Sequence, residues 1–366
     1  MAPIIKALRL RRFHFKFVNS GQHYDHQLSG SFINDLGLPE PDCNLDVRAE
    51  TPAASTGEMV IRAAQAIKKL DPSLVLVQGD TNTALAATIA ALKEAVPVGH
   101  VESGLRSYDW RMPEEHNRRM IDHVSNYLFA PTSTASRNLL DEKAPGQVYV
   151  TGNTVIDAII NNMPKAEAIS EITERLRFSE FILATAHRAE NVDNPHVLRE
   201  FIEVFRNLPL PVAFPVHPRT VNRLRQLDLL DRLDASEQIQ LLPPVGYFDF
   251  LMLMKRCSLI LTDSGGVQEE ATAPTIRKRV VVMRNSTERP EAVDSGFAKI
   301  AGTRKDDILK CAIDSLECDE ELPSRSPFGT GRAGEEIARL SVEIVNSDNR
   351  PMQILATAHP IVIDRK

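Results

Sequence analysis

Short apolar runs alternate with amphipathic stretches along most of the chain. The apolar runs predict buried parallel strands, and apolar residues at helical spacing predict helices between them. In the first half, the expected strands are 13–18, 74–78, 97–100, 128–130 and 148–151. The expected helices there are 29–36, 55–70, 83–93 and 114–126. This alternation indicates a βαβ series with a parallel sheet.

The second half repeats the alternation. Its expected strands are 181–184, 212–214, 239–242, 259–262 and 280–283. We expect the polar segment 163–177 to hold the linker. The sequence therefore predicts an α/β fold with two doubly wound, Rossmann-like domains that face each other across a cleft. The expected domains are 1–160 with a helix near 333–347 packed back on it, then 161–332, then a tail of unknown structure at 348–366.

Polar residues follow the expected strands of the first half at their carboxyl ends. Asp80 follows one strand, and Glu102 follows the next strand along the chain. In open α/β sheets, this edge is where ligands bind. Glu114 and Arg118 follow on an expected helix, where Arg118 or Arg119 can orient a carboxylate. These residue types predict a crevice for acid/base chemistry on a charged ligand.

The second half carries its own strand-end chemistry. His187 and His217 each follow an expected strand, and a Ser-Gly-Gly turn at 264–266 lies between a strand and a helix. Such a turn presents backbone N–H groups that suit a diphosphate, and Glu270 could accept both hydroxyls of a ribose. The competing interpretation is a capped helix with nothing bound. We prefer the ligand-binding interpretation because Asp80 and His187 also lie at strand ends.

Composition excludes several classes of protein. The 366 residues are 43% hydrophobic and 25% charged, which suits two globular domains. A net charge of −6 without a long basic run argues against nucleic acid as a partner. No apolar run approaches the roughly 20 residues that span a bilayer, and the start lacks the apolar core of a signal peptide. The four cysteines have no metal-binding spacing, so we expect a cytoplasmic enzyme.

Two other patterns have a simpler explanation. The segment 329–334 matches the dinucleotide fingerprint G-x-G-x-x-G, but it follows a proline-rich stretch and not a strand. We therefore expect a loop and a helix start there. His100, Glu102 and His116 could be imagined as metal ligands, but their spacing matches no zinc pattern. We expect no metal and no other cofactor.

Together these stretches resemble one family, the non-hydrolysing UDP-N-acetylglucosamine 2-epimerases, and especially its archaeal members. The matching segments are 21–25, 77–85, 100–107, 112–118, 152–154, 187–191, 217–220, 263–270 and 287–291. The resemblance spans nearly the whole chain. It implies the two-domain fold called GT-B in glycosyltransferases, a homodimer, and catalysis without a cofactor.

The resemblance also implies roles for individual residues. It assigns the catalytic carboxylates to Asp80, Glu102 and Glu114, and a cleft histidine to His187. It assigns contacts with the nucleotide to Phe250, Ser264, Gly265, Gly266, Glu270 and Arg289. The matching stretches add four further candidates for substrate binding, which are His23, Arg118, Arg188 and His217.

The implied reaction is epimerisation at C2 of UDP-N-acetylglucosamine to UDP-N-acetylmannosamine, for polysaccharide or glycoprotein sugar synthesis. In this route UDP is eliminated to give 2-acetamidoglucal and is then added back. Three alternatives stay open: a 2-epimerase of a UDP-2,3-diacetamido uronic sugar, a retaining glycosyltransferase, and a UDP-sugar-binding pseudoenzyme.

The chain departs from the family pattern at its start. Family members begin with a strand and a Gly-Thr-Arg-Pro-Glu loop whose basic groups contact the nucleotide sugar, whereas this chain begins inside the first helix, at 2–10. We therefore expect an unfilled slot in the first sheet, a reading frame that begins upstream, and weakened activity of the chain as given. A second departure is Arg277, at a position where a glycine commonly lies.

Overall fold

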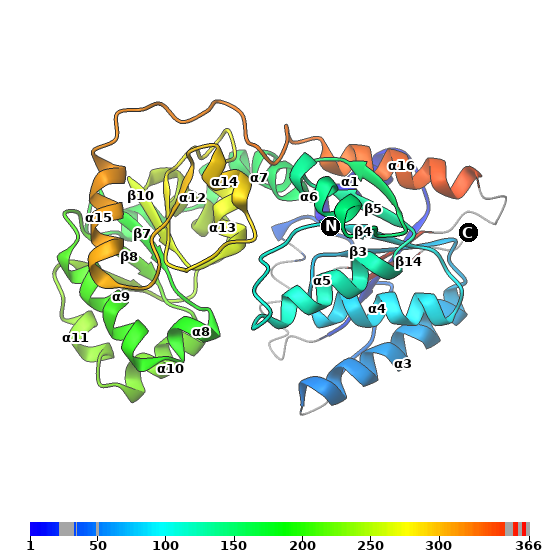
Figure 1. Cartoon of the computed structure of the whole chain (residues 1–366), viewed down its shortest axis with the longest axis horizontal. Coiled ribbons are helices and arrows are strands. Elements are labelled where there is room, and N and C mark those ends of the chain that lie inside the picture. The colour runs from blue at the N-terminus through cyan, green and yellow to red at the C-terminus, as the bar shows by residue number, and fades with distance from the viewer. Residues whose placement is uncertain (22–32, 34, 49–50, 348–353, 358–360, 364–366) are drawn as a thin grey trace. The chain divides into compact units, whose positions relative to one another are not determined.

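The computed structural model describes residues 1–21, 33, 35–48, 51–347, 354–357 and 361–363 (Figure 1). The chain divides into two compact units. Unit 1 comprises Met1–Ala158 and Phe328–Lys366, and unit 2 comprises Ile159–Pro327. The boundary falls within a helix, α7 (Thr154–Ile169). Within the part of the chain that is described, no helix is long and apolar enough to cross a membrane.

Unit 1 is built on an eight-stranded sheet with the order β2-β1-β14-β13-β3-β4-β5-β6. Its strands are β1 (Phe15–Asn19), β2 (Cys43–Asn44), β3 (Leu74–Gln78), β4 (Val98–Val101), β5 (Tyr127–Ala130), β6 (Gln147–Val150), β13 (Ile354–Thr357) and β14 (Ile361–Ile363). Its helices besides α7 are α1 (Ala2–Leu10), α3 (Pro52–Leu70), α4 (Asn82–Lys93), α5 (Pro113–Val124), α6 (Ser133–Asp141) and α16 (Ala333–Ser347).

Helices cover both faces of this sheet because β3 is apolar on both sides. Val75 and Val77 pack in one cluster with the apolar stripe of α3 and the alanine-rich α4. Leu74 and Leu76 pack in another cluster with α1 and α16, which lie against each other. Successive side chains of a strand point to opposite faces, so the two clusters are the two faces of the sheet. The result is a three-layer Rossmann-like unit.

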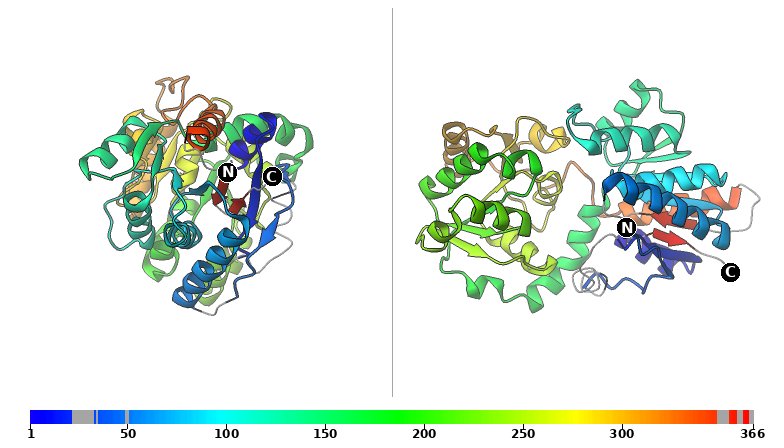
Figure 2. Two further views of the ribbon diagram at one scale, coloured as in Figure 1. Left: turned by 90° about the vertical axis from the view of Figure 1, so that its right-hand side faces the viewer. Right: turned by 90° about the horizontal axis from the view of Figure 1, so that it is seen from below.

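The C-terminal tail contributes two strands to this sheet. β13 pairs in parallel with β1 on one side, where Phe15 lies opposite Ile354, and with Leu74 of β3 on the other. β14 is antiparallel to β1 and β13. Figure 2 shows the red strands of the tail beside the blue strand β1. In this sheet, where the sequence led us to expect an unfilled slot, β13 lies between β1 and β3.

Unit 2 contains a six-stranded parallel sheet with the order β12-β11-β10-β7-β8-β9. Its strands are β7 (Ile182–Thr185), β8 (Val212–Pro215), β9 (Ile239–Leu242), β10 (Leu259–Thr262), β11 (Val280–Val282) and β12 (Ala298–Ile300). Its helices are η1 (Ile172–Arg175), α8 (Ala189–Val192), α9 (Pro195–Asn207), α10 (Pro218–Gln226), α11 (Leu230–Asp234), α12 (Tyr247–Arg256), α13 (Gly265–Glu270), α14 (Pro290–Asp294) and α15 (Lys305–Leu316).

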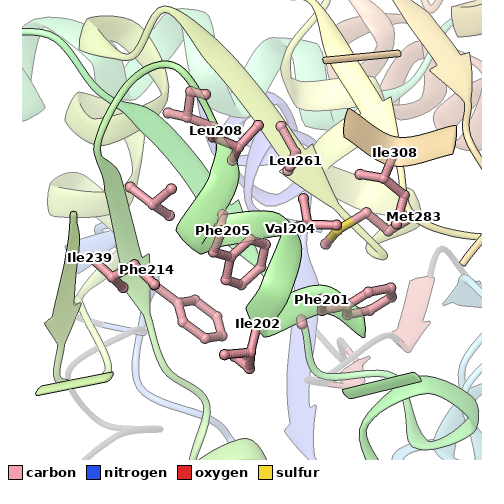
Figure 3. Packing of buried hydrophobic residues seen from close by; sticks show 14 of the residues in the cluster. Phe201, Ile202, Val204, Phe205, Leu208, Phe214, Ile239, Leu261, Met283 and Ile308 are labelled. Atoms are coloured by element: carbon pink, nitrogen blue, oxygen red, sulfur yellow. The ribbon is translucent and has the colours of Figure 1, made fainter. Parts of the chain in front are cut away.

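The core of unit 2 forms where α9 lies on the sheet. Its apolar face, with Phe201, Ile202 and Phe205, packs in one buried cluster with Phe214 of β8 and Ile239 of β9 (Figure 3). Asn194 caps the start of α9, since its side chain accepts hydrogen bonds from two backbone N–H groups. A well-packed sheet of this kind fixes the ends of its strands, which is what a site at those ends requires.

Two local features bear on expectations drawn from the sequence, the segment 163–177 and the residue Arg277. The segment 163–177, which we expect to hold the linker, completes α7 and forms η1, because Met163, Ala166 and Ile172 are buried. Arg277 has a φ of 48°, in the left-handed region that favours glycine. This conformation explains why a glycine would suit the position.

The tail strand makes a testable prediction about stability. Deleting residues 348–366 removes β13 and β14, and so leaves β1 and β3 without their shared neighbour. Unpaired backbone groups inside a sheet are costly, so we expect the shortened chain to melt at a lower temperature or to aggregate. Thermal unfolding followed by circular dichroism measures the difference. Equal melting temperatures for both chains would show that the tail does not complete the sheet.

Candidate functional site

Two carboxylates lie at the ends of neighbouring strands in unit 1. β3 and β4 run in parallel with Gln78 opposite Val101, so the residues that follow, Asp80 and Glu102, emerge at the same edge. The Asp80 side chain is 30% exposed, which leaves it open to a ligand. Glu102 is half-buried and accepts a hydrogen bond from the Gln78 amide. Its φ of 69° lies in the left-handed region, which is uncommon outside glycine.

Arg118 holds Asp80 in place. Its Nε and Nη2 donate to Asp80 Oδ2 at 3.1 and 2.6 Å, while its Nη1 donates to Glu115 Oε2 at 2.9 Å. The Arg118 side chain is only 3% exposed. Its donors are directed at two carboxylates, so this geometry favours the orienting role over direct contact with a substrate. Asn117 adds a hydrogen bond to the backbone oxygen of Asp80.

The two adjacent glutamates at the start of α5 have different environments. Glu115 is fully buried and accepts hydrogen bonds from Ser107, Arg118 and Arg119. Burial alone would raise the pKa of Glu115, but the Ser107 N–H and the charge of Arg118 outweigh burial and hold the pKa below its usual value. Glu114 is half-buried in the first helical turn, where the helix dipole favours a negative charge. Glu115 is therefore structural, and Glu114 is the one available for chemistry.

His100 supports the loop beneath Asp80 and is not directed at a ligand. The ring is completely buried, with Nδ1 2.7 Å from Asp122 Oδ1 and Nε2 3.0 Å from the carbonyl oxygen of Gly79. Both ring nitrogens thus have partners in the protein. The second contact fixes the turn that leads from β3 to Asp80.

In unit 2, His187 lies just beyond β7 and next to a buried carboxylate. Its Nδ1 lies 3.3 Å from Asp263 Oδ1, and its side chain is 41% exposed. His217 follows β8, and the centroids of the two imidazole rings are 6.0 Å apart. Burial lowers the pKa of His217, as do the nearby His187 and Arg219.

These two histidines line a cavity of about 260 Å³. Its other lining residues are Thr185, Ala186, Pro215, Val216, Pro244, Val245, Phe250, Ser264 and Val267. The lining is largely apolar, with polar groups gathered on the side of the strand ends. A flat, partly apolar ring with a charged extension, such as a nucleotide, suits a cavity of this kind.

The Ser-Gly-Gly turn contributes Ser264 to this cavity. The surroundings of its two glycines differ. Ser264 caps α13, since its Oγ accepts from the backbone N–H of Val267. A Cβ at Gly265 would lie only 2.2 Å from Oε1 of Glu288. At Gly266, the nearest atom to an added Cβ is Ser264 Oγ at 4.0 Å. Gly265 is therefore required by packing against a buried carboxylate, whereas Gly266 faces open space.

Glu288 forms ion pairs with arginines beside this turn. It accepts from Arg188 Nη2 at 3.1 Å and from Arg284 Nη1 at 2.9 Å, and it is 3% exposed. Arg289 pairs with Glu269, with 2.7 Å between Nε and Oε1. The predicted ligand contacts Arg188 and Arg289 thus belong to a buried ionic cluster. Glu288 and Asp263, which organise the turn and the histidine, were not among the predicted site residues, although both lie within the motifs that carried the family resemblance.

Glu270 ends α13, and burial raises its pKa to about 7. By its exposed surface Glu270 is half-buried, and its charge also contributes to the raised pKa of Tyr247, after burial of the phenol itself. A glutamate whose ionisation is costly in the free protein gains from donors that a ligand would bring. His23, the remaining predicted residue, lies outside the residues that the structure describes.

Comparison with known proteins finds similarity over nearly the whole length of the chain. A family model described as UDP-N-acetylglucosamine 2-epimerase matches residues 6–341. A UDP-N-acetylglucosamine 2-epimerase of Methanocaldococcus jannaschii is 40% identical, over 93% of this chain and 94% of the relative. The crystal structure of UDP-GlcNAc 2-epimerase from that organism, in complex with UDP-GlcNAc and UDP, superimposes with a TM-score of 0.85 at 40% identity, covering 93% of this chain and 94% of that one.

A relative whose name gives a different substrate is also similar. The UDP-2,3-diacetamido-2,3-dideoxy-D-glucuronate 2-epimerase of Pseudomonas aeruginosa is 38% identical, over 88% of this chain and 89% of the relative. The fold class predicted from the sequence, two Rossmann-like units of the GT-B type, is confirmed by the solved structures and by the two sheets. The chain belongs to the UDP-N-acetylglucosamine 2-epimerase family.

Proposed function

We propose that this protein is an isomerase that interconverts UDP-N-acetylglucosamine and UDP-N-acetylmannosamine. The observation that carries the proposal is the pair of strand-end carboxylates in unit 1, Asp80 and Glu102. Each is accessible, and each is held by a neighbouring side chain. They occur in a chain that is 40% identical to a UDP-N-acetylglucosamine 2-epimerase over nearly its whole length.

The chemistry explains why such carboxylates are needed. The proton at C2 of the sugar is not next to a carbonyl group, so an enolate cannot form. In the proposed route, a base removes this proton while the bond between C1 and the phosphate oxygen breaks, which gives 2-acetamidoglucal and UDP. An acid then delivers a proton to C2 from the other face, and UDP adds back to C1. The reaction needs one acid/base group on each face of the ring, and Asp80, Glu102 and Glu114 are the candidates.

Unit 2 supplies the groups that would hold UDP. The cavity lined by Phe250 and the two histidines suits the nucleotide, and the turn at Ser264 and Gly266 offers backbone N–H groups to the diphosphate. Arg289 and His187 would stabilise the negative charge that develops as UDP leaves.

Cellular context and assembly are part of the same proposal. All four cysteines are free, which suits a reducing compartment, and we propose a cytoplasmic location. We propose a homodimer from the family resemblance. UDP-sugar is the proposed substrate, and no cofactor is invoked in any step.

Incubation with UDP-N-acetylglucosamine in deuterated water tests the reaction itself. An epimerase exchanges the C2 proton with solvent, so NMR should show deuterium at C2 in both epimers. A retaining glycosyltransferase or a binding protein would leave C2 unlabelled. Parallel incubation with the 2,3-diacetamido uronic sugar nucleotide separates the two substrates: labelling of that compound alone would overturn the assignment of substrate.

Removal of a catalytic charge should slow the reaction without abolishing nucleotide binding. We expect Asp80→Asn and Glu102→Gln each to lower kcat by about 10²–10⁴-fold, the usual contribution of an acid/base group. UDP binding, measured by calorimetry, should change little because its proposed contacts lie in unit 2. Glu94→Gln, at the end of α4 and paired with the exposed Lys68, is the matched control and should behave like wild type. A variant with unchanged turnover would show that its carboxylate is structural.

Glu270→Gln should separate stability from binding, in a way that depends on pH. The pKa of Glu270 is raised to about 7 in the folded protein from a usual value of 4.5. The folded state therefore binds this proton more tightly than the unfolded state does, and stability is lost as pH rises from 4.5 through 7. Because glutamine stays neutral, the variant should melt on the order of a few degrees above wild type at pH 8 and close to wild type at pH 4.5.

The same variant should bind UDP more weakly at pH 8, since the proposed acceptor for the ribose hydroxyls is lost. Glu237→Gln, at an exposed position, is the control for a change of charge. If Glu270→Gln melted at or below the wild-type temperature at pH 8, the buried charge would not be destabilising.

A further inference from the structure

A single buried carboxylate, Asp263, organises the loop that carries His187. Asp263 follows β10 and is completely buried. Its Oδ2 accepts from the backbone N–H of Arg188 at 3.0 Å, from the backbone N–H of His187 at 3.1 Å, and from Nδ2 of Asn191 at 3.1 Å. Its Oδ1 lies 3.2 Å from the same His187 N–H and 3.3 Å from the ring Nδ1. Asp263 thus binds both the backbone and the ring of the histidine.

This arrangement follows from the register of the sheet. β7 and β10 are adjacent parallel strands, with Thr185 opposite Thr262. Their hydroxyl groups hydrogen-bond to each other at 2.6 Å, so both strands end at a fixed level. Asp263 is the next residue after β10, and His187 is two residues after β7. The carboxylate therefore reaches the turn at His187 without any distortion of the strands.

The donor and acceptor roles determine which ring nitrogen carries the proton. Burial alone would raise the pKa of Asp263, but the interactions with His187 and the N–H of Arg188 outweigh burial and hold the pKa below its usual value. An ionised carboxylate only accepts hydrogen bonds. The ring nitrogen nearest to it, Nδ1, is therefore favoured as the one that carries a hydrogen. Nε2 is then the nitrogen left for a ligand, on a side chain that is 41% exposed.

The other titratable neighbours do not compete for Nδ1. The second imidazole, His217, accepts at its own Nδ1 from the backbone N–H of Arg219 at 3.2 Å. The side chain of Arg219 pairs with Asp193. Arg188, on the same loop as His187, directs its guanidinium to Glu288. Asp263 is therefore the acidic group that contacts the His187 ring among these residues.

We propose that Asp263 is a positioning residue for His187, which holds the imidazole in the Nδ1–H form and leaves Nε2 to address the diphosphate of the substrate. An unprotonated Nε2 only accepts hydrogen bonds, so its contact with the diphosphate requires a proton at Nε2, taken from solvent. Asp263 then faces the Nδ1–H of the ring while the Nε2–H donates to the diphosphate. This inference rests on the proposed function only in naming the diphosphate as the group that Nε2 meets. The tautomer itself does not depend on the reaction.

NMR of protein labelled with ¹⁵N-histidine tests the tautomer directly. His187→Gln identifies the resonances of His187 by their loss. At a pH where the ring is neutral, we expect wild-type His187 to show a protonated Nδ1 and an unprotonated Nε2. Asp263→Asn should shift the ring toward the Nε2–H form. A wild-type ring in the Nε2–H form, or an unchanged tautomer in Asp263→Asn, would overturn the proposal.

Kinetics with a matched variant separates positioning from a merely structural role. Asp263→Asn should lower kcat by about 10–100-fold, as is usual for a group that orients a functional histidine, with a smaller change in KM. Asn191→Ala removes one donor to Oδ2 but leaves the contact with the ring, so its tautomer and kcat should stay close to wild type. If Asn191→Ala lost as much kcat as Asp263→Asn while its tautomer was unchanged, Asp263 would have only a structural role.

The outcomes are also distinct from failure of the proposed function. If Asp263→Asn does not fold, the wild-type spectrum still decides the tautomer. If the protein does not epimerise UDP-N-acetylglucosamine but His187 has the Nδ1–H form, the positioning role holds and the proposed function fails. If it epimerises but His187 has the Nε2–H form, only the positioning role fails.

Discussion

In each unit, the candidate residues depend on one kind of interaction, the contact between an accessible polar group and a buried charged partner. Arg118 is the buried partner of Asp80, and Asp263 is the buried partner of His187. Glu288 is the buried group that fixes the turn at Gly265, because a side chain at this position would meet its carboxylate. In each case the partner is at most 3% exposed, so its position is set by the core of its own unit. The accessible group is therefore held in a fixed position relative to the sheet.

Such buried partners are costly unless every charge is matched. Breaking a buried ion pair typically costs about 3–5 kcal/mol, because the remaining charge is left uncompensated. Glu115 illustrates the solution, since hydrogen bonds from Ser107, Arg118 and Arg119 surround its carboxylate. Glu270 illustrates the opposite case, because burial raises its pKa to about 7 and no compensating cause accompanies the shift. The stability lost at Glu270 is explained if its carboxylate accepts hydrogen bonds from the hydroxyls of a bound nucleotide.

The fold and the accessible site residues could be predicted from the sequence because their signals are local. Apolar runs locate the strands to within a residue or two, as with β9 and β10, and polar residues directly after them locate Asp80, Glu102 and His187. The partners could not be predicted in the same way. Asp263 and Glu288 lie within recognisable motifs, but their roles depend on contacts with residues 72 to 100 positions away. The tail strands β13 and β14 were not predicted, because they belong to this sheet only through pairing with β1 and β3, which lie far away in the sequence.

Positional isotope exchange tests the central claim, that the bond between C1 and UDP breaks during epimerisation, more directly than any variant does. The substrate would carry ¹⁸O in the oxygen that joins C1 to the β-phosphate, and ³¹P NMR would follow its position during turnover. We expect the label to spread to the non-bridging oxygens of the β-phosphate as C2 epimerises. Retention of all the label in the bridging position, while UDP-N-acetylmannosamine accumulates, would show that this bond stays intact.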